Sequence, residues 1–166
     1  MKSTKIDGKR RRLSSLVPVC ALFLFAATAQ AQTVSATACT VNITSIKEGD
    51  QVGASATIKG TATHPVDGYL WIMARKTSMG NQWWPQAGGA VETGQRNGDW
   101  EAEVFFGRSS DVGSNFDVAA VVVNRQTSTE LTKWFSTAKE LDYPPIRFPD
   151  AISGCPVVLV RVTKAR

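Results

Sequence analysis

Alternation of apolar and polar side chains, broken by turn residues about every 8–12 positions, is the feature that most constrains this chain. Its clearest instance places Glu101 and Glu103 between four apolar residues: Trp100, Ala102, Val104 and Phe106. That spacing predicts a half-buried strand with one solvent face. Residues 69–75 are apolar on both faces, which is typical of a central strand covered on each side. With further strands expected over 54–62, 116–124 and 157–162, the sequence predicts a mainly β, antiparallel β-sandwich.

One segment has a helical period instead. Its apolar residues recur three and four positions apart: Leu131, Trp134, Phe135, Ala138 and Leu141. This spacing predicts one amphipathic helix over about 128–140, before the last strand. Thr127 and Glu130 fit a capping box at its start. We expect the helix to lie over an open end or edge of the sandwich, with Trp134 in the core.

The first 31 residues have the composition of an export signal. A basic segment precedes an apolar run from Leu16 to Ala27, and Ala29-Gln30-Ala31 has the pattern of a cleavage site. The run is shorter than the roughly 20 residues that span a bilayer, so no membrane insertion of the mature chain is expected. The paired arginines of 10–12 leave a twin-arginine signal as the alternative to the general secretory route. We predict a signal peptide over 1–31, one domain over 32–166, and a periplasmic or secreted location.

The positive charge of the chain belongs to this signal. The whole chain carries 19 Lys and Arg against 14 Asp and Glu, a net charge of +5. Residues 1–31 hold six of these bases and one of the acids, so 13 bases and 13 acids remain after cleavage. Nucleic acids and anionic membranes attract proteins through an excess of Lys and Arg. Neither partner is therefore expected.

Two cysteines remain after cleavage, one near each end of the mature chain. Cys39 and Cys155 enclose more than 100 residues, as a disulfide that ties the two ends together in an oxidising compartment would. Two free buried thiols are the alternative.

Few residues suit catalysis. His64 is the one histidine of the chain, and it precedes a proline in a predicted turn, so a histidine-based metal site or catalytic triad has little support. Glu101 and Glu103 share one face of a strand at roughly 7 Å, within the range of an inverting glycosidase pair. Glutamates on the wet face of a strand are the simpler interpretation. We expect no enzyme activity, no cofactor and no metal.

The adjacent Trp83 and Trp84 are the strongest candidate for a binding surface. Side chains of neighbouring strand residues point to opposite faces, so at most one of the two faces the core, while the other lies under the helix or at a rim. Pro85 indicates an edge strand or a strand end. Because aromatic residues and Arg dominate binding hot spots, we predict a contact surface drawn from five residues: Trp83, Trp84, Gln86, Tyr143 and Arg75.

Several short motifs occur in a familiar order. These are Val52…Gly60, Leu70-Trp71-Ile72, Trp83-Trp84-Pro85-Gln86, Asp111-Val112-Gly113…Phe116-Asp117-Val118, a helix with Leu131 and Trp134, and Tyr143-Pro144-Pro145-Ile146. Together they span most of the mature chain. In this pattern the chain resembles a family of small bacterial exported immunoglobulin-like domains. The resemblance implies a β-sandwich with an accessory or binding role, and it carries over no catalytic residue.

The sequence thus favours an exported, non-catalytic binding module of the bacterial envelope, whose partner is an envelope protein or a cell-wall glycan. An inhibitor or immunity protein acting against a secreted enzyme or toxin is one alternative. A glycan hydrolase that uses Glu101 and Glu103 is another. The oligomeric state, and which of Trp83 and Trp84 is buried, stay open at this point.

Overall fold

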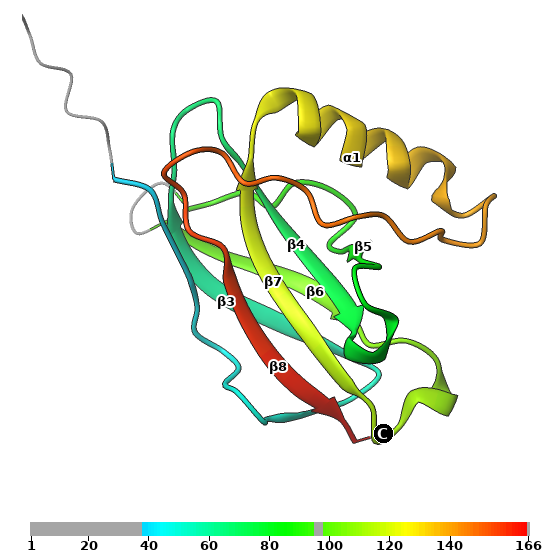
Figure 1. The fold of residues 1–166 in the computed structure, drawn as a ribbon. Helices are drawn as coiled ribbons and strands as arrows, with labels where there is room; N and C mark the ends of the chain where they lie inside the picture. Colours follow the sequence, from blue (N-terminus) through cyan, green and yellow to red (C-terminus); the bar gives the residue numbers. More distant parts are fainter. Residues whose placement is uncertain (1–37, 95–97, 166) are drawn as a thin grey trace, which may run out of the picture. The chain divides into compact units, whose positions relative to one another are not determined.

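The computed structural model describes residues 38–94 and 98–165, and the predicted signal over 1–31 lies outside them. The described elements, shown in Figure 1, are β1 (Thr40–Ile43), β2 (Gln51–Val52), β3 (Ser55–Thr63), β4 (Tyr69–Lys76), η1 (Thr77–Met79), β5 (Trp84–Pro85), β6 (Asp99–Phe105), η2 (Ser109–Asp111), β7 (Asn115–Val123), α1 (Arg125–Ala138) and β8 (Val158–Lys164). None of the described helices is long and apolar enough to cross a membrane.

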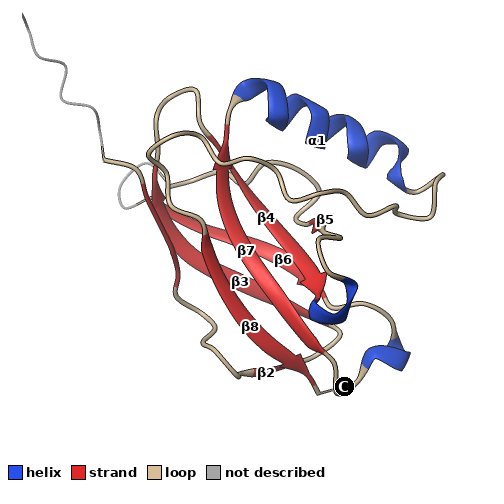
Figure 2. Cartoon of the chain, viewed as in Figure 1, coloured by secondary structure: helices blue, strands red, loops and turns tan. Residues whose placement is uncertain are grey.

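The strands form two sheets that pack face to face (Figure 2). One has the order β1-β3-β6 and the other β2-β8-β7-β4-β5. Neighbouring strands are antiparallel, except that β2 runs parallel to β8 over two residues. The predicted mainly β sandwich is confirmed. Its division of strands corresponds to that of immunoglobulin-like sandwiches, in which strands A, B and E face strands G, F and C.

The main core lies between the sheets, where the predicted alternation puts it. In β6, Trp100, Ala102 and Val104 are buried while the two glutamates between them are exposed. The indole of Trp100 lies directly against Gly60 of β3, and a Cβ at Gly60 would collide with it. A glycine is therefore required opposite this tryptophan.

A second apolar layer covers the outer face of the five-stranded sheet. It consists of Trp71, Met73, Trp83, Ala119, Val121, Val123 and Leu131. Over this face lie α1 and the connector of residues 139–157 (Figure 1). The fully buried Trp71 donates its indole N–H to the hydroxyl of Ser128 at 3.0 Å. Its ring stacks on Phe135, with 6.1 Å between ring centroids.

The predicted position of the helix, over an open end or edge, is therefore wrong. Because β4 and β7 are apolar on both faces, the outer face of their sheet needs a cover of its own. The helix supplies that cover.

The helix also begins earlier than predicted. Asn124 is its N-cap, and its side-chain oxygen accepts the N–H of Thr127 at 2.9 Å. Thr127 and Glu130 lie inside the helix, where Glu130 accepts a bond from Gln126, so the predicted capping box is wrong. Leu141 lies beyond the helix and is 63% exposed.

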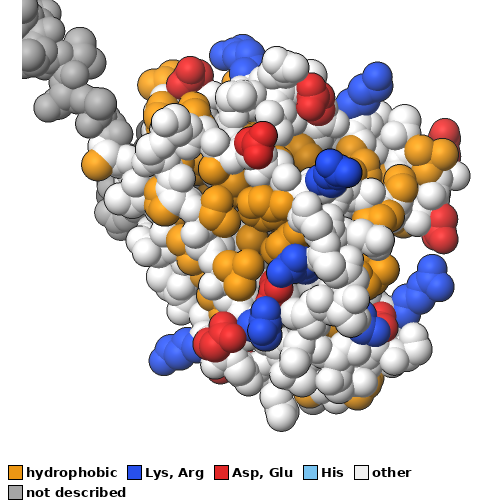
Figure 3. Space-filling view, in the orientation of Figure 1, with side chains coloured by type: hydrophobic (Ala, Val, Ile, Leu, Met, Phe, Trp, Pro, Cys, Tyr) orange, Lys and Arg blue, Asp and Glu red, His pale blue; other side chains and the backbone are white. Residues whose placement is uncertain are grey.

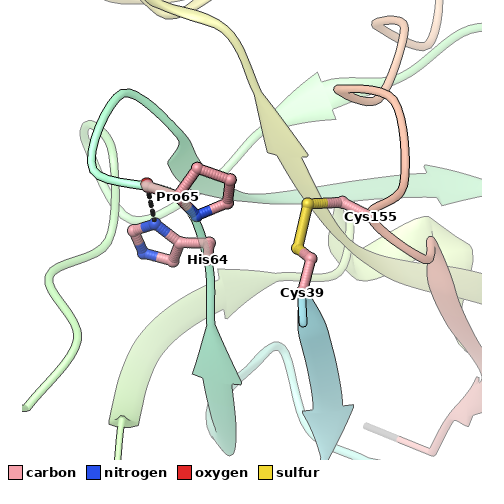
Figure 4. Close-up of a disulfide and its surroundings, with 4 residues drawn as sticks. All are labelled: Cys39, His64, Pro65 and Cys155. Carbon is pink, nitrogen blue, oxygen red and sulfur yellow. Dashed lines mark hydrogen bonds between the residues drawn. A yellow bond between two sulfur atoms is a disulfide. The ribbon is translucent and has the colours of Figure 1, made fainter. Parts of the chain in front are cut away.

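Cys39 and Cys155 form a disulfide, as predicted, with their Cα atoms 5.0 Å apart. It ties the residue before β1 to the connector that leads into β8 (Figure 4). His64 lies in the expected turn after β3, where its Nδ1 is 3.0 Å from the carbonyl oxygen of Pro65. A disulfide between the two ends of the domain is consistent with an oxidising compartment.

Candidate functional site

Trp83 and Trp84 differ in burial, as their adjacency predicts. Trp83 is 3% exposed and packs edge-on against Phe148, with 4.7 Å between ring centroids. The guanidinium of Arg75 also lies against this ring, 4.5 Å from its centroid. Trp84 is half-buried and lies in β5, the edge strand that Pro85 indicates. Trp83 therefore belongs to the second apolar layer, and Trp84 is the member of the pair that reaches the surface.

Trp84 lies beside Tyr143, which the sequence also singled out, and Tyr143 in turn lies beside Trp134. The indole N–H of Trp84 donates to the carbonyl oxygen of Tyr143 at 2.7 Å, and that of Trp134 donates to Pro144 at 3.0 Å. The rings of Trp134 and Tyr143 are 6.3 Å apart. We call Trp84, Trp134 and Tyr143 the aromatic surface. Because both indole donors are used inside the protein, a partner would contact the exposed parts of the rings rather than the indole N–H groups.

The predicted core position of Trp134 is wrong, since this side chain is half-buried. The residues of α1 that face the sheet are Ser128, Leu131 and Phe135. Trp134 packs instead against the connector that returns beside the helix. It is the one member of the aromatic surface that the sequence did not place among the binding candidates.

The backbone that presents Tyr143 has an unusual conformation. Asp142 and Tyr143 both have a φ of 53°, a left-handed geometry that costs a non-glycine residue about 1–2 kcal/mol. The N–H of Tyr143 donates to the carbonyl of Ala138 at 2.6 Å, and the carbonyl of Tyr143 accepts the bond from Trp84, so the peptide groups before and after Tyr143 are both held. The result is a rigid turn that leaves the Tyr143 side chain 50% exposed.

Arg75 does not join this surface. It lies in a row with Asp117 and Arg161, directly opposite one another on β4, β7 and β8. The fully buried carboxylate of Asp117 accepts Nε of Arg75 at 2.9 Å and Nε of Arg161 at 2.7 Å. Burial alone would raise the pKa of Asp117, but the hydrogen bonds from Arg161 and Arg75 outweigh it and hold the pKa below its usual value. Arg75 is thus engaged in an internal ion cluster.

Gln86 is also an internal residue, 7% exposed. Its main-chain N–H donates to Ile72 of β4 at 2.8 Å, while its side-chain oxygen accepts the N–H of Phe105 of β6 at 2.9 Å. Its side-chain amide donates to the carbonyl of Trp84 at 3.0 Å. Gln86 therefore bridges the two sheets, and its polar atoms face away from any partner.

Glu101 and Glu103 lie on the exposed face of β6. The carboxylate of Glu101 pairs with Lys59 on the neighbouring strand at 3.3 Å, and both side chains are well exposed. Across the described residues, no group of three His, Cys, Asp or Glu side chains is placed to hold a metal ion.

A second polar cluster, which the sequence did not indicate, fixes the loop around η2. Lys76 and Asp111 form an ion pair at 2.8 Å, and the hydrogen bonds from Lys76 and from the Arg108 N–H hold the pKa of Asp111 below its usual value. Lys164, which is 1% exposed, donates to the carbonyl of Arg108 at 2.6 Å. These contacts close one end of the sandwich.

Hydrophobic side chains also gather on the outer face of the five-stranded sheet, with charged side chains around them (Figure 3). Leu159 of β8 and the preceding Val157 are exposed by 45% and 44%. On the same face, Phe148 and Ala151 of the connector are half-buried against the second apolar layer. This patch is the margin of that layer beside the connector.

Comparison with known proteins adds no assignment, because no protein-family model and no curated protein matches the chain. The candidate site therefore rests on its geometry. Of the five predicted contact residues, the structure brings Trp84 and Tyr143 together at the surface. It places Trp83, Gln86 and Arg75 in the interior or in an ion cluster.

Proposed function

We propose that this protein is an exported, non-catalytic binding module of the bacterial envelope that engages a partner protein through the aromatic surface. The observation that carries the proposal is the convergence of Trp84, Trp134 and Tyr143 from separate parts of the chain, with both indole donors already bonded to backbone carbonyls. Rigid, partly exposed aromatic rings are the residues from which binding hot spots are built.

The surroundings of this surface favour a protein partner over a glycan. Leu141, 63% exposed, precedes Tyr143 by two residues, and Pro145 beside them is exposed as well. Of the charged groups here, Asp142 is paired with Arg108 at 3.6 Å. A sugar site needs polar groups placed beside the ring to bond hydroxyls, whereas apolar residues around aromatic rings suit the core of a protein interface.

Export is supported by two independent features. Residues 1–31 have the composition of a cleavable signal. The disulfide between Cys39 and Cys155 fits the oxidising compartment to which such a signal leads. Glu101 is paired with Lys59 and both side chains are well exposed, which supports the non-catalytic assignment.

A pull-down from envelope extract with the mature protein, followed by titration of the purified partner, tests the proposal. The variant Leu141→Ser with Tyr143→Asn removes the exposed apolar groups, and asparagine tolerates the left-handed backbone of position 143. We expect affinity to fall on the order of 30-fold, as loss of a hot spot of about 2 kcal/mol does.

Val66→Ser is the matched control, since Val66 is fully exposed in a turn away from this surface, and it should bind as the wild type does. Equal binding by the double variant would overturn the proposal. Retention on isolated cell-wall glycan, lost in the same double variant, would replace the protein partner with a glycan.

A further inference from the structure

The edge of β6 is a second candidate binding site in the molecule, besides the aromatic surface. β6 is an edge strand of its sheet, and alternate residues of such a strand direct their backbone groups to opposite sides. The bonds from Ala62 N–H to Gly98 and from Phe106 N–H to Ala54 show that the even-numbered residues pair with β3. The odd-numbered residues of β6 therefore turn their N–H and C=O groups to the open edge.

Residues 86–94 cover this edge at its two ends only. Three outward groups are bonded to the loop: the Asp99 carbonyl to Gly94 at 2.7 Å, the Glu103 carbonyl to Ala87 at 3.3 Å, and the Phe105 N–H to the Gln86 side chain at 2.9 Å. Between these points lie the main-chain N–H and C=O of Glu101, which have no hydrogen-bond partner within the described part of the chain. The N–H of Glu103 likewise has no partner among the described residues, so two donors and one acceptor are left free in the middle of the edge.

A groove opens at this place. Its volume is about 760 Å³, and its lining includes Lys59 and Thr61 of β3, Trp100 and Glu101 of β6, and Val91 and Glu92 of the loop. Trp100 is 4% exposed, and its indole N–H is buried without a hydrogen-bond partner among the residues that the structure describes. A buried donor of this kind costs about 1–3 kcal/mol unless it is satisfied. The free backbone groups of Glu101 therefore lie at the groove, whereas the indole N–H of Trp100 belongs to the buried core.

The charge of the groove restricts what can bind there. Glu92, Asp99 and Glu101 line it, and Lys59, paired with Glu101 at 3.3 Å, is the one base in the lining. A second copy of β6 would bring its own row of acids opposite this one, and like charges directly opposite destabilise a strand pair. The same row attracts a partner that carries Lys or Arg.

We propose that this groove binds an extended, basic segment of a partner protein. The main chain of the segment pairs with the N–H and C=O of Glu101, as in strand addition to a sheet edge. Its Lys or Arg side chains meet the carboxylates of Glu92, Asp99 and Glu101. The start of β6 and the turn after α1 lie on different sides of the sandwich (Figure 1), so the groove is separate from the aromatic surface. The proposal for the groove therefore does not depend on the proposal for the aromatic surface.

The test is a titration of ¹⁵N-labelled, disulfide-bonded protein with three blocked pentapeptides, to about 5 mM, since weak strand addition lies near the millimolar range. The first alternates lysine with valine, the second replaces lysine by glutamate, and the third is the lysine peptide N-methylated on the edge that would pair. We expect only the first to shift the amide signals of Glu101 and Glu103 and the indole signal of Trp100. Saturation should also slow exchange of the Glu101 amide by roughly tenfold, as a new main-chain hydrogen bond would.

Variants separate charge recognition from folding. Glu92→Gln with Glu101→Gln changes two exposed side chains and should weaken the lysine peptide by roughly fivefold or more. Glu130→Gln with Glu140→Gln, an equal change of charge on exposed residues in and just after α1, should leave binding unchanged. Absence of binding, equal binding of the glutamate or N-methylated peptide, or shifts confined to the aromatic surface would each overturn the proposal.

Discussion

The disulfide should carry a large part of the stability of this domain. Cys39 and Cys155 are 116 residues apart, and a cross-link over that span lowers the entropy of the unfolded chain by about 16 cal/mol/K in the chain-entropy relation. At 25 °C this corresponds to about 4.8 kcal/mol. Domains of this size have a free energy of unfolding of about 5–15 kcal/mol. Reduction should therefore bring the protein close to its stability limit.

Urea unfolding followed by tryptophan fluorescence, with and without reductant, measures the effect. With a slope of about 2 kcal/mol/M, the midpoint should fall by about 2.4 M on reduction, and the slope should rise because the reduced unfolded chain is less compact. The Cys39→Ala, Cys155→Ala variant is the control, since it removes the bond without reductant and should unfold within about 1 kcal/mol of the reduced wild type. A midpoint shift below about 0.5 M, with an unchanged slope, would refute the argument that the bond acts through the unfolded chain.

Three further changes test the interior. Asp117→Asn leaves two arginines without their carboxylate, and we expect a loss of about 2–4 kcal/mol, less than for a fully buried pair because Arg161 is 46% exposed. In the wild type, the pKa of Asp117 is lowered by folding, so the ionised carboxylate stabilises the protein fully above the unfolded pKa of about 3.9. This stabilisation is lost as the pH falls through the lower folded pKa. Urea midpoints measured from pH 6 to pH 2 should therefore fall less steeply in the variant than in the wild type. Gly60→Ala should be destabilised by about 1–3 kcal/mol in thermal unfolding, because its Cβ collides with the carbonyl oxygen of Asn42 and with the Trp100 indole; an unchanged melting temperature would contradict this packing. Gln86→Met keeps the side-chain volume but leaves the Phe105 N–H unpaired, so the free energy of unfolding should fall by about 1–3 kcal/mol. The Phe105 amide should also exchange faster with solvent. If it stays protected from exchange, the hydrogen bond from Phe105 to Gln86 is dispensable.

The strands of this fold can be predicted from the sequence because burial in a sandwich is decided residue by residue along each strand. The alternation around Glu101 and Glu103 gives the two faces of β6 directly. The double-sided apolar character of 69–75 gives β4 as a central strand. What such patterns do not contain is the position of elements that cover a sheet from outside. The apolar outer face of β4 calls for a cover, but the sequence does not say that α1 supplies it.

Two residues near the start of the helix could cap it, and the structure shows that Asn124 does so rather than Thr127. Thr127 and Glu130 have capping-box spacing, yet Asn124 is the first polar residue after the valine-rich β7. Because the chain leaves the sheet there, the helix begins at once and Asn124 receives the capping bond. The choice depends on where β7 ends, which is a property of its pairing with β4 and β8.

The candidate site is harder to predict, because its members meet only through the return of the connector. Trp84 and Tyr143 are 59 residues apart in the sequence, and both are predicted as contact residues because they are aromatic. Arg75 is predicted as a contact residue in the same way, but the strand register places it opposite the buried Asp117. Asp117 between two apolar residues of a predicted strand is a visible anomaly, but its partners depend on the order β8-β7-β4, which periodicity does not give.

The four residues from Trp83 to Gln86 connect the two candidate surfaces to the packing of the sandwich. Trp83 anchors the second apolar layer, and Trp84 one position later reaches the aromatic surface. Pro85 ends the edge strand, and Gln86 then ties β4 to β6. Because Gln86 also begins the loop that borders the β6 groove, four consecutive residues connect the packing of the sandwich to both surfaces. A change here is therefore expected to alter stability first, and its effect on binding has to be read against that loss.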